Sequence, residues 1–214
     1  MTDSQNDPAN DPRQSAPSAL RNRDPILAQL RVLLPGQGRV VEVASGTGEH
    51  VAHFAAHLPG LMFQPTNRDD AGRASIDAWA AGLTNVRKAI PLDATGDWPR
   101  EIYNAVLCIN MIHIAPWEAT LGLVRNAAHV LEPGGMLVLY GPFRRAGRHT
   151  ASSNAAFDAD LRGRDAAWGV RDLEDVAEVA ARHGFGAPDV VALPANNLLV
   201  SFSLKTVPAA VTRT

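Results

Sequence analysis

Short apolar runs alternate along the chain with longer segments in which apolar residues recur every three or four positions. The short runs predict β-strands at residues 40–44, 61–67, 86–92, 105–110, 136–140, 190–193 and 198–204. The longer segments predict α-helices at residues 48–58, 70–81, 116–131 and 172–183, and a short helix beginning at residues 24–25. Strands that alternate with helices favour a parallel sheet covered by helices on both faces.

The last two predicted strands are joined without an intervening helix. Only the turn-forming sequence Pro-Ala-Asn-Asn, at residues 194–197, lies between them. Strands connected this tightly must lie antiparallel, as in a hairpin. We therefore expect an α/β fold with a Rossmann-like, doubly wound sheet of seven strands, mostly parallel, ending in a C-terminal antiparallel hairpin.

The two ends of the chain lack this pattern. Residues 1–20 are rich in Asp, Asn, Pro, Ser and Gln, which predicts a disordered N-terminal tail, and residues 207–214 predict a loose C-terminal tail. Residues 21–206 are then expected to form a single domain. Within it, residues 142–168 are a long connection that we interpret as an insert on the substrate side, because long connections in compact domains are usually functional or disordered.

Composition excludes several classes of protein. The net charge of −2 gives no basic surplus for general nucleic-acid binding, and the apolar runs are too short to span a membrane. No signal peptide is evident at the start of the sequence. The single cysteine, Cys108, lies in an apolar run and is interpreted as a small buried residue. We expect a cytoplasmic protein with no nucleic-acid or membrane partner.

A glycine-rich turn joins the first strand of the sheet to its helix, in the sequence RVVEVASGTGEH at residues 39–50. Gly46 and Gly48 allow a ligand to approach the backbone closely, and the following helix offers free N–H groups. Glu42 places a carboxylate near the end of the strand. A carboxylate there would repel a pyrophosphate but suits a ligand that carries a cationic amino group.

This turn resembles the acid-x-Gly-x-Gly-x-Gly motif of class I S-adenosylmethionine (SAM) methyltransferases, with Ala44 in place of the first glycine. The dinucleotide motif G-x-G-x-x-G fits less well, because it would require glycine at Val51. The segment EPGGMLVL at residues 132–139 is also a frequent feature of these enzymes.

Several segments narrow the resemblance to the methyltransferase-like family known as domain of unknown function 938. They are RNRDPIL, EVASGTGEH, CINMIHIAPW, YGPFR, SNAAFD, WGVRDL and PANN, in this order. That family has no settled substrate, so the resemblance implies SAM as the cofactor and leaves the acceptor open.

The methyltransferase resemblance also implies which residues bind SAM: Glu42, Ala44, Ser45, Gly46, Gly48, His50, Asn67, Asp69, Asp93, Ala94, Asn110 and Met111. Asn67 stands where these enzymes normally have an acid for the ribose, so a charge-assisted hydrogen bond is missing unless Asp69 compensates. Asp93 would bond the adenine amino group. Two alternatives stay open: Glu42 as a carboxylate that caps nearby N–H groups, and Asp93 as a helix N-cap.

Methyl transfer to an aligned nucleophile requires no catalytic triad. If a general base exists, His113 is the candidate, and the alternative is a packing histidine. We expect an acceptor pocket lined by Tyr140, Phe143, Arg144, Asn154, Phe157, Asp158, Trp168, Arg171, Asn196 and Asn197. Arg144 could bind a carboxylate or phosphate. His50, His53 and His57 share a helix face, but without further ligands nearby they predict no metal site.

The leading hypothesis is a SAM-dependent methyltransferase that acts on a small polar molecule. A catalytically inert SAM-fold binding protein is an alternative, because Asn67 replaces the usual acid. A nicotinamide-dependent oxidoreductase is a weaker alternative, disfavoured by Glu42 and the final hairpin. The sequence does not reveal the oligomeric state.

Overall fold

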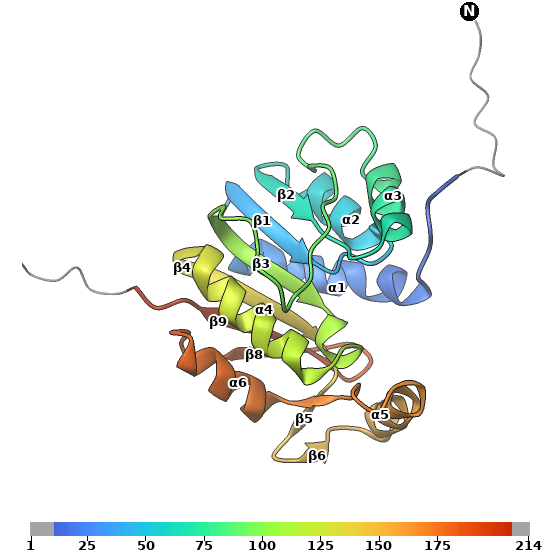
Figure 1. Cartoon of the computed structure of the whole chain (residues 1–214), viewed down its shortest axis with the longest axis vertical. Helices are drawn as coiled ribbons and strands as arrows, with labels where there is room; N and C mark the ends of the chain where they lie inside the picture. Colours follow the sequence, from blue (N-terminus) through green and yellow to red (C-terminus); the bar gives the residue numbers. More distant parts are fainter. Residues whose placement is uncertain (1–10, 207–214) are drawn as a thin grey trace, which may run out of the picture.

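The computed structural model describes residues 11–206, which form an α/β fold around one mixed, mostly parallel sheet (Figure 1). The strand order is β2-β1-β3-β4-β9-β8. These strands are β1 (Gly38–Val43), β2 (Leu61–Pro65), β3 (Tyr103–Ile109), β4 (Leu131–Gly141), β8 (Asp189–Leu193) and β9 (Asn197–Ser203). The first four in this order pair in parallel, whereas β9 is antiparallel to both β4 and β8. The predicted doubly wound sheet with a C-terminal antiparallel pair is confirmed.

The sheet has six strands rather than the seven that the sequence predicts. Residues 86–92 form only two isolated parallel bridges, from Val86 to Phe63 and from Ile90 to Thr66. Between these bridges, the side chain of Gln64 donates a hydrogen bond to the Lys88 carbonyl (2.9 Å). Pro65 has no backbone N–H to continue the ladder, and the Ile90 N–H rather than that of Ala89 donates to the Pro65 carbonyl (3.2 Å), so the register shifts and the regular pairing is interrupted.

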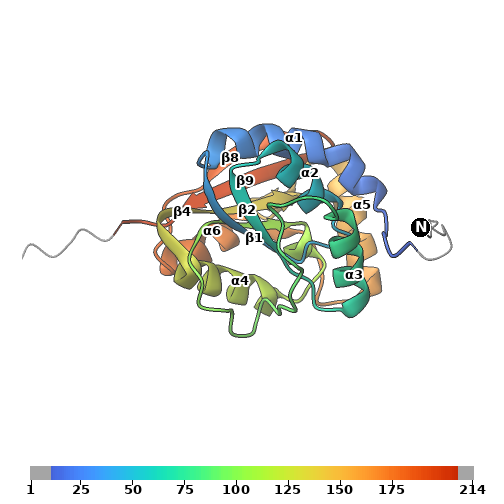
Figure 2. The ribbon, with the colours of Figure 1, turned by 90° about the horizontal axis from the view of Figure 1, so that it is seen from above.

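Helices cover both faces of the sheet (Figure 2). One face packs against α1 (Pro17–Leu33), α2 (Glu49–His57) and α3 (Asp70–Trp79), and the other against α4 (Trp117–Val130) and α6 (Leu173–Arg182). Successive strand residues alternate between these two cores: Val40 belongs to the first and Val41 to the second. No helix within residues 11–206 is long and apolar enough to cross a membrane.

The N-terminal helix begins earlier than the sequence predicts. Residues 11–16 lie along α2 and α3, and α1 starts at Pro17, so the predicted disorder is wrong for residues 11–20; residues 1–10 lie outside the described part. Glu49 accepts hydrogen bonds from the Ser15 hydroxyl (3.0 Å) and the Ala16 N–H (2.6 Å). Polar contacts from another helix thus order a segment that has little apolar surface of its own.

The connection after β4 contains a second, small sheet in the order β6-β5-β7, together with one helix. Its elements are β5 (Phe143–Arg145), β6 (Arg148–His149), α5 (Ser152–Arg164) and β7 (Arg171–Asp172). In Figure 1 they lie together beside α6. A short 3-10 helix, η2 (Met111–His113), follows β3.

Candidate functional site

The glycine-rich turn between β1 and α2 has a left-handed backbone. Gly46 has φ +58° and Gly48 has φ +95°, and a Cβ on Gly48 would come within 2.6 Å of the Ile76 backbone. Ala44 also has positive φ, +56°, so it adopts a backbone conformation that glycine would take without strain. Ser45 N–H donates to the Thr66 carbonyl (2.8 Å), which ties the turn to the end of β2.

Glu42 is a buried acid with an unsatisfied oxygen beneath this turn. It is 1% exposed, and Oε2 has no hydrogen-bond partner within the part of the chain that the structure describes. Burial raises its pKa to about 7, although a hydrogen bond with Ser45 opposes the shift. A buried carboxylate without a partner is costly in free energy, and a cationic ligand would remove that cost.

A cavity of about 610 Å³ opens at the carboxyl ends of β1, β2 and β3, and we call it the Asp93 cavity. Six of the predicted cofactor residues line it: Ala44, Asn67, Asp69, Asp93, Ala94 and Met111. The remaining lining residues are Val43, Arg68, Leu92, Thr95, Ile114, Ala115, Pro116, Glu118 and Ala119. The strand ends of the fold therefore bring together residues that the sequence spreads over 77 positions, from Val43 to Ala119.

The polar groups of the Asp93 cavity are partly engaged with the protein. Asp93 accepts from the N–H (2.8 Å) and hydroxyl (2.7 Å) of Thr95, which lower its pKa, and its other oxygen lies 3.4 Å from Arg68. Asp69 caps α3. Asn67 donates from Nδ2 to the Gly46 carbonyl (3.0 Å). No helix follows Asp93, because residues 94–95 form only a turn, so the N-cap interpretation is wrong; its carboxylate instead closes this turn and lines the cavity.

The other predicted cofactor residues do not line this cavity. Glu42, Ser45, Gly46 and Gly48 form the strand and turn beside it, and Asn110 lines a second cavity. His50 points away, because its Nε2 lies 2.6 Å from Asn22 Oδ1 on α1, and burial lowers its pKa to about 4. Within residues 11–206, no group of three or more His, Cys, Asp or Glu side chains could hold a metal ion.

The second cavity measures about 880 Å³, and we call it the Tyr140 cavity. It is lined by Ser18, Arg21, Asn22, Pro25, Asn110, Ile114, Tyr140, Pro142, Ser153, Asn154, Phe157, Pro194, Ala195 and Asn197. Ile114 lines both cavities, and the consecutive residues Asn110 and Met111 line one each. The two cavities therefore meet where β3 ends.

Four of the predicted acceptor residues line the Tyr140 cavity: Tyr140, Asn154, Phe157 and Asn197. Asn196 lies beside it, with its carbonyl accepting from Asn154 Nδ2 (2.9 Å). The other predicted residues are not among the lining. Phe143 is fully buried in the core, and the side chain of Trp168 packs against Arg164.

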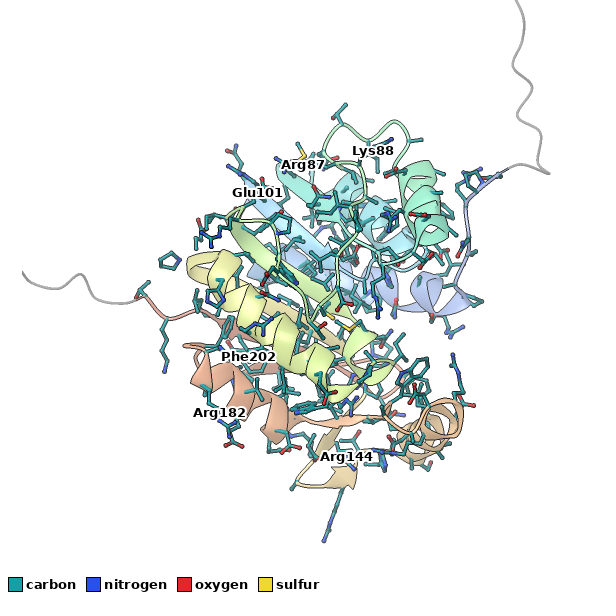
Figure 3. All side chains as sticks on the ribbon, viewed as in Figure 1. Arg87, Lys88, Glu101, Arg144, Arg182 and Phe202 are labelled. Carbon is teal, nitrogen blue, oxygen red and sulfur yellow. The ribbon has the colours of Figure 1, made fainter. Side chains whose placement is uncertain are left out.

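The charged residues predicted for the acceptor pocket make contacts with other protein groups. Arg144, labelled in Figure 3 beside β5, pairs with Asp172 (2.6 Å) instead of facing a cavity. Asp158 accepts from Val170 N–H (2.6 Å) and Arg162. Arg171 donates to backbone carbonyls, among them that of Ile112 (2.9 Å). These side chains tie the insert to β7 and tie Arg171 to the segment that follows β3.

Helix α1 supplies a wall of the Tyr140 cavity that sequence reasoning missed. Ser18, Arg21, Asn22 and Pro25 come from this helix. The signal was present, because three of these residues lie in or next to the RNRDPIL segment that resembles the family. The pattern of apolar residues could not show which cavity that segment faces.

His113 lies in an environment that favours the packing interpretation. It is fully buried, its ring contacts Phe143 edge-on, and it lines neither cavity. Burial and the charge of Arg171 lower its pKa to about 3. A histidine with such a pKa is a weak base at neutral pH.

The sheet order, the glycine-rich turn and the cavities at the strand ends together define a methyltransferase-like Rossmann fold. The chain belongs to the family described as "Protein of unknown function (DUF938)", whose sequence model matches residues 13–204.

Solved structures of methyltransferases resemble this chain in fold. An O-methyltransferase family protein from Burkholderia thailandensis matches with a TM-score of 0.75 at 19% identity, covering 88% of this chain and 57% of that one. Human N-acetylserotonin methyltransferase in complex with SAM has a TM-score of 0.75 at 12% identity, covering 88% and 53%. CalO1, a methyltransferase in calicheamicin biosynthesis with S-adenosylhomocysteine (SAH) bound, matches with a TM-score of 0.67 at 15% identity, covering 87% of this chain and 56% of that one. This chain thus spans little more than half the length of the structures that it matches.

Proposed function

We propose that this protein is a SAM-dependent methyltransferase that acts on a small polar acceptor. The observation that carries the proposal is the pair of cavities that meet at the carboxyl end of β3. Ligands of α/β folds bind at this end of the sheet, and two cavities allow a cofactor and an acceptor to meet there. The fold of the family, and neighbours that bind SAM or SAH, support the same interpretation.

The residues of the Asp93 cavity, and of the strand and turn beside it, fit this cofactor. The unsatisfied oxygen of Glu42 would accept from a cationic amino group, and the open N–H groups at the start of α2 would hold a carboxylate. Asp93 would accept from an adenine amino group through the oxygen that now faces Arg68. SAM, when bound, supplies a methyl group on a sulfonium, which is an activated carbon.

The Tyr140 cavity would bind and orient the acceptor without a general base. None of its lining residues, all of which are described, is Asp, Glu, His, Lys or Cys. Alignment and exclusion of water can supply much of the rate of such a displacement. We therefore assign no general base to this cavity, and we expect the reacting atom of the acceptor to be unprotonated, with a free lone pair.

Calorimetric titration of the purified protein with SAM, SAH and NADPH tests the proposal. We expect micromolar binding of both SAM and SAH, reduced at least about tenfold by Asp93→Ala. Glu178→Gln, on the exposed surface of α6, is the matched control and should leave binding unchanged. NADPH is included because Arg68 follows β2, where an arginine can hold a ribose phosphate.

Each outcome separates the proposal from its alternatives. SAM binding followed by methyl transfer to a small molecule would establish the enzyme. Binding of SAM and SAH with no transfer to any acceptor would favour the inert binding protein. Binding of NADPH in place of SAM would favour the oxidoreductase and overturn the proposal.

A further inference from the structure

The lining of the Tyr140 cavity has an unusual balance of charge. Arg21 is its one charged residue, and the other polar lining side chains are amides, serine hydroxyls and the tyrosine. Within residues 11–206, no carboxylate lies within ion-pair distance of Arg21, although other arginines of the chain are paired. The side chain is exposed at the cavity, so its charge is available to a ligand.

Helix α1 packs against α2 and the sheet, and this places the backbone of Arg21 beside the cavity. The neighbouring Asn22 is buried, with His50 Nε2 lying 2.6 Å from its Oδ1. Because Oδ1 can only accept, His50 is the donor. Tyr140 lies next to this pair: burial raises its pKa, whereas hydrogen bonds from Asn22 and Asn197 and the charge of Arg21 lower it. Arg21 and Tyr140 line the same cavity.

We infer that the acceptor is a small carboxylate, held by the guanidinium of Arg21 on the α1 wall of the Tyr140 cavity. This inference rests on the proposed function and names its substrate class. A guanidinium binds a carboxylate through two parallel hydrogen bonds, and Ser18 and Ser153 place further hydroxyls on the lining. One unpaired cation balances a single negative charge, whereas a phosphate dianion would leave charge uncompensated.

The held carboxylate is an anchor, separate from the reacting atom. The reacting atom donates a lone pair to the methyl carbon, the carbon–sulfur bond breaks, and its electron pair passes to sulfur, which becomes neutral. No proton moves in this step, in agreement with a lining that has no general base. The class of acceptor is therefore a carboxylic acid that also carries an unprotonated nitrogen or a thiolate.

Nicotinate and nicotinamide form a matched pair of probes for this anchor. They share a ring nitrogen with a free lone pair and differ in carrying a carboxylate or a carboxamide. We expect SAH-loaded protein to bind nicotinate about tenfold more tightly than nicotinamide in calorimetric titrations. Arg21→Met should abolish this preference, and Arg21→Lys should keep part of it because the charge remains.

Arg31→Met is the matched control, because Arg31 lies in the last turn of the same helix and lines neither cavity. It should keep the full preference. Unchanged SAH affinity in Arg21→Met would show that this variant is folded. The inference is overturned if nicotinamide binds as tightly as nicotinate, if the preference survives in Arg21→Met, or if SAH-loaded protein binds neither probe at about 10 mM. Failure of SAH itself to bind would instead overturn the proposed function.

Discussion

The two cavities are built in different ways, although they share a wall at Ile114. The Asp93 cavity is formed by strand ends and by the turns and helix starts that directly follow them. The Tyr140 cavity is assembled from α1, the end of β4, α5 and the turn before β9, which are far apart in the sequence. Under the proposed function, the strand ends of the general fold would provide the cofactor side, whereas α1 and α5 would add to these strand ends what the acceptor side recognises.

Glu42→Gln should have the largest effect, and it should be confined to the Asp93 side. Glutamine keeps the size of the side chain but cannot carry the negative charge that a cationic amino group needs. We expect SAM and SAH affinity to fall about 10- to 100-fold, as loss of a hydrogen bond to a charged group predicts. Calorimetry measures this effect.

The contrast between the two cavities would fail if Glu42→Gln bound SAM normally. It would also fail if the Glu42→Gln variant, saturated with SAH, no longer bound nicotinate more tightly than nicotinamide. Glu178→Gln serves again as the exposed control.

The affinity for SAM should depend on pH through Glu42, which belongs to the Asp93 side alone. Because the pKa of Glu42 is raised to about 7, the carboxyl is mostly protonated at pH 6 and mostly ionised at pH 8. A cationic amino group binds the ionised form, so SAM affinity should rise about tenfold from pH 6 to pH 8, with proton release on binding. Titration in buffers of different ionisation enthalpy measures the released proton. A pH-independent affinity, or one that falls over this range, would contradict the role of Glu42.

The same residue has the opposite effect on folding without a ligand. The folded pKa lies above the ordinary value of 4.5, so the folded protein binds more protons than the unfolded chain between pH 4.5 and 7. The stability contributed by this group is therefore complete below pH 4.5 and is lost as the pH rises through 7. Binding of SAM would offset the stability that the ligand-free protein loses as the pH rises through 7.

The sequence could predict most of the Asp93 side, because positions at strand ends follow from the periodicity that defines the strands. It could predict only part of the Tyr140 side, because polarity does not show whether a side chain faces a cavity or a protein partner. Arg144 pairs with Asp172 and Asp158 with Arg162, whereas Arg21 has no ion-pair partner within residues 11–206. Residues 11–16 are ordered by Glu49, a contact between segments that periodicity does not connect.

Glu49→Gln should affect both sides moderately, because Glu49 anchors the segment that leads into α1. Its carboxylate accepts from Ser15, from Ala16 N–H and from the Thr47 hydroxyl in the glycine-rich turn. Glutamine retains one accepting oxygen, so we expect the free energy of unfolding to fall by about 1 kcal/mol. Chemical denaturation measures this loss. Equal stability in the variant and the wild type would show that the segment is held by other contacts.

Asn67→Asp should have the smallest effect, and its direction is informative. An aspartate would restore the acid that methyltransferases normally place near the ribose. In this structure, however, Asn67 Nδ2 donates a hydrogen bond to the Gly46 carbonyl. A carboxylate at this position has no N–H to donate, so its oxygen would face the carbonyl oxygen without a hydrogen bond. We expect SAM affinity to weaken about threefold because the turn loses one hydrogen bond.

Asn67→Ala distinguishes the two possible causes. If the lost donor is responsible, alanine and aspartate should weaken SAM binding by similar factors, and neither should alter the preference of the Tyr140 cavity for nicotinate. If aspartate instead tightens binding while alanine weakens it, the side chain must leave Gly46 and turn toward the ribose. In that case a single substitution would restore the contact with the ribose. SAM affinity on the Asp93 side would then depend more on individual side chains than on the backbone of the fold.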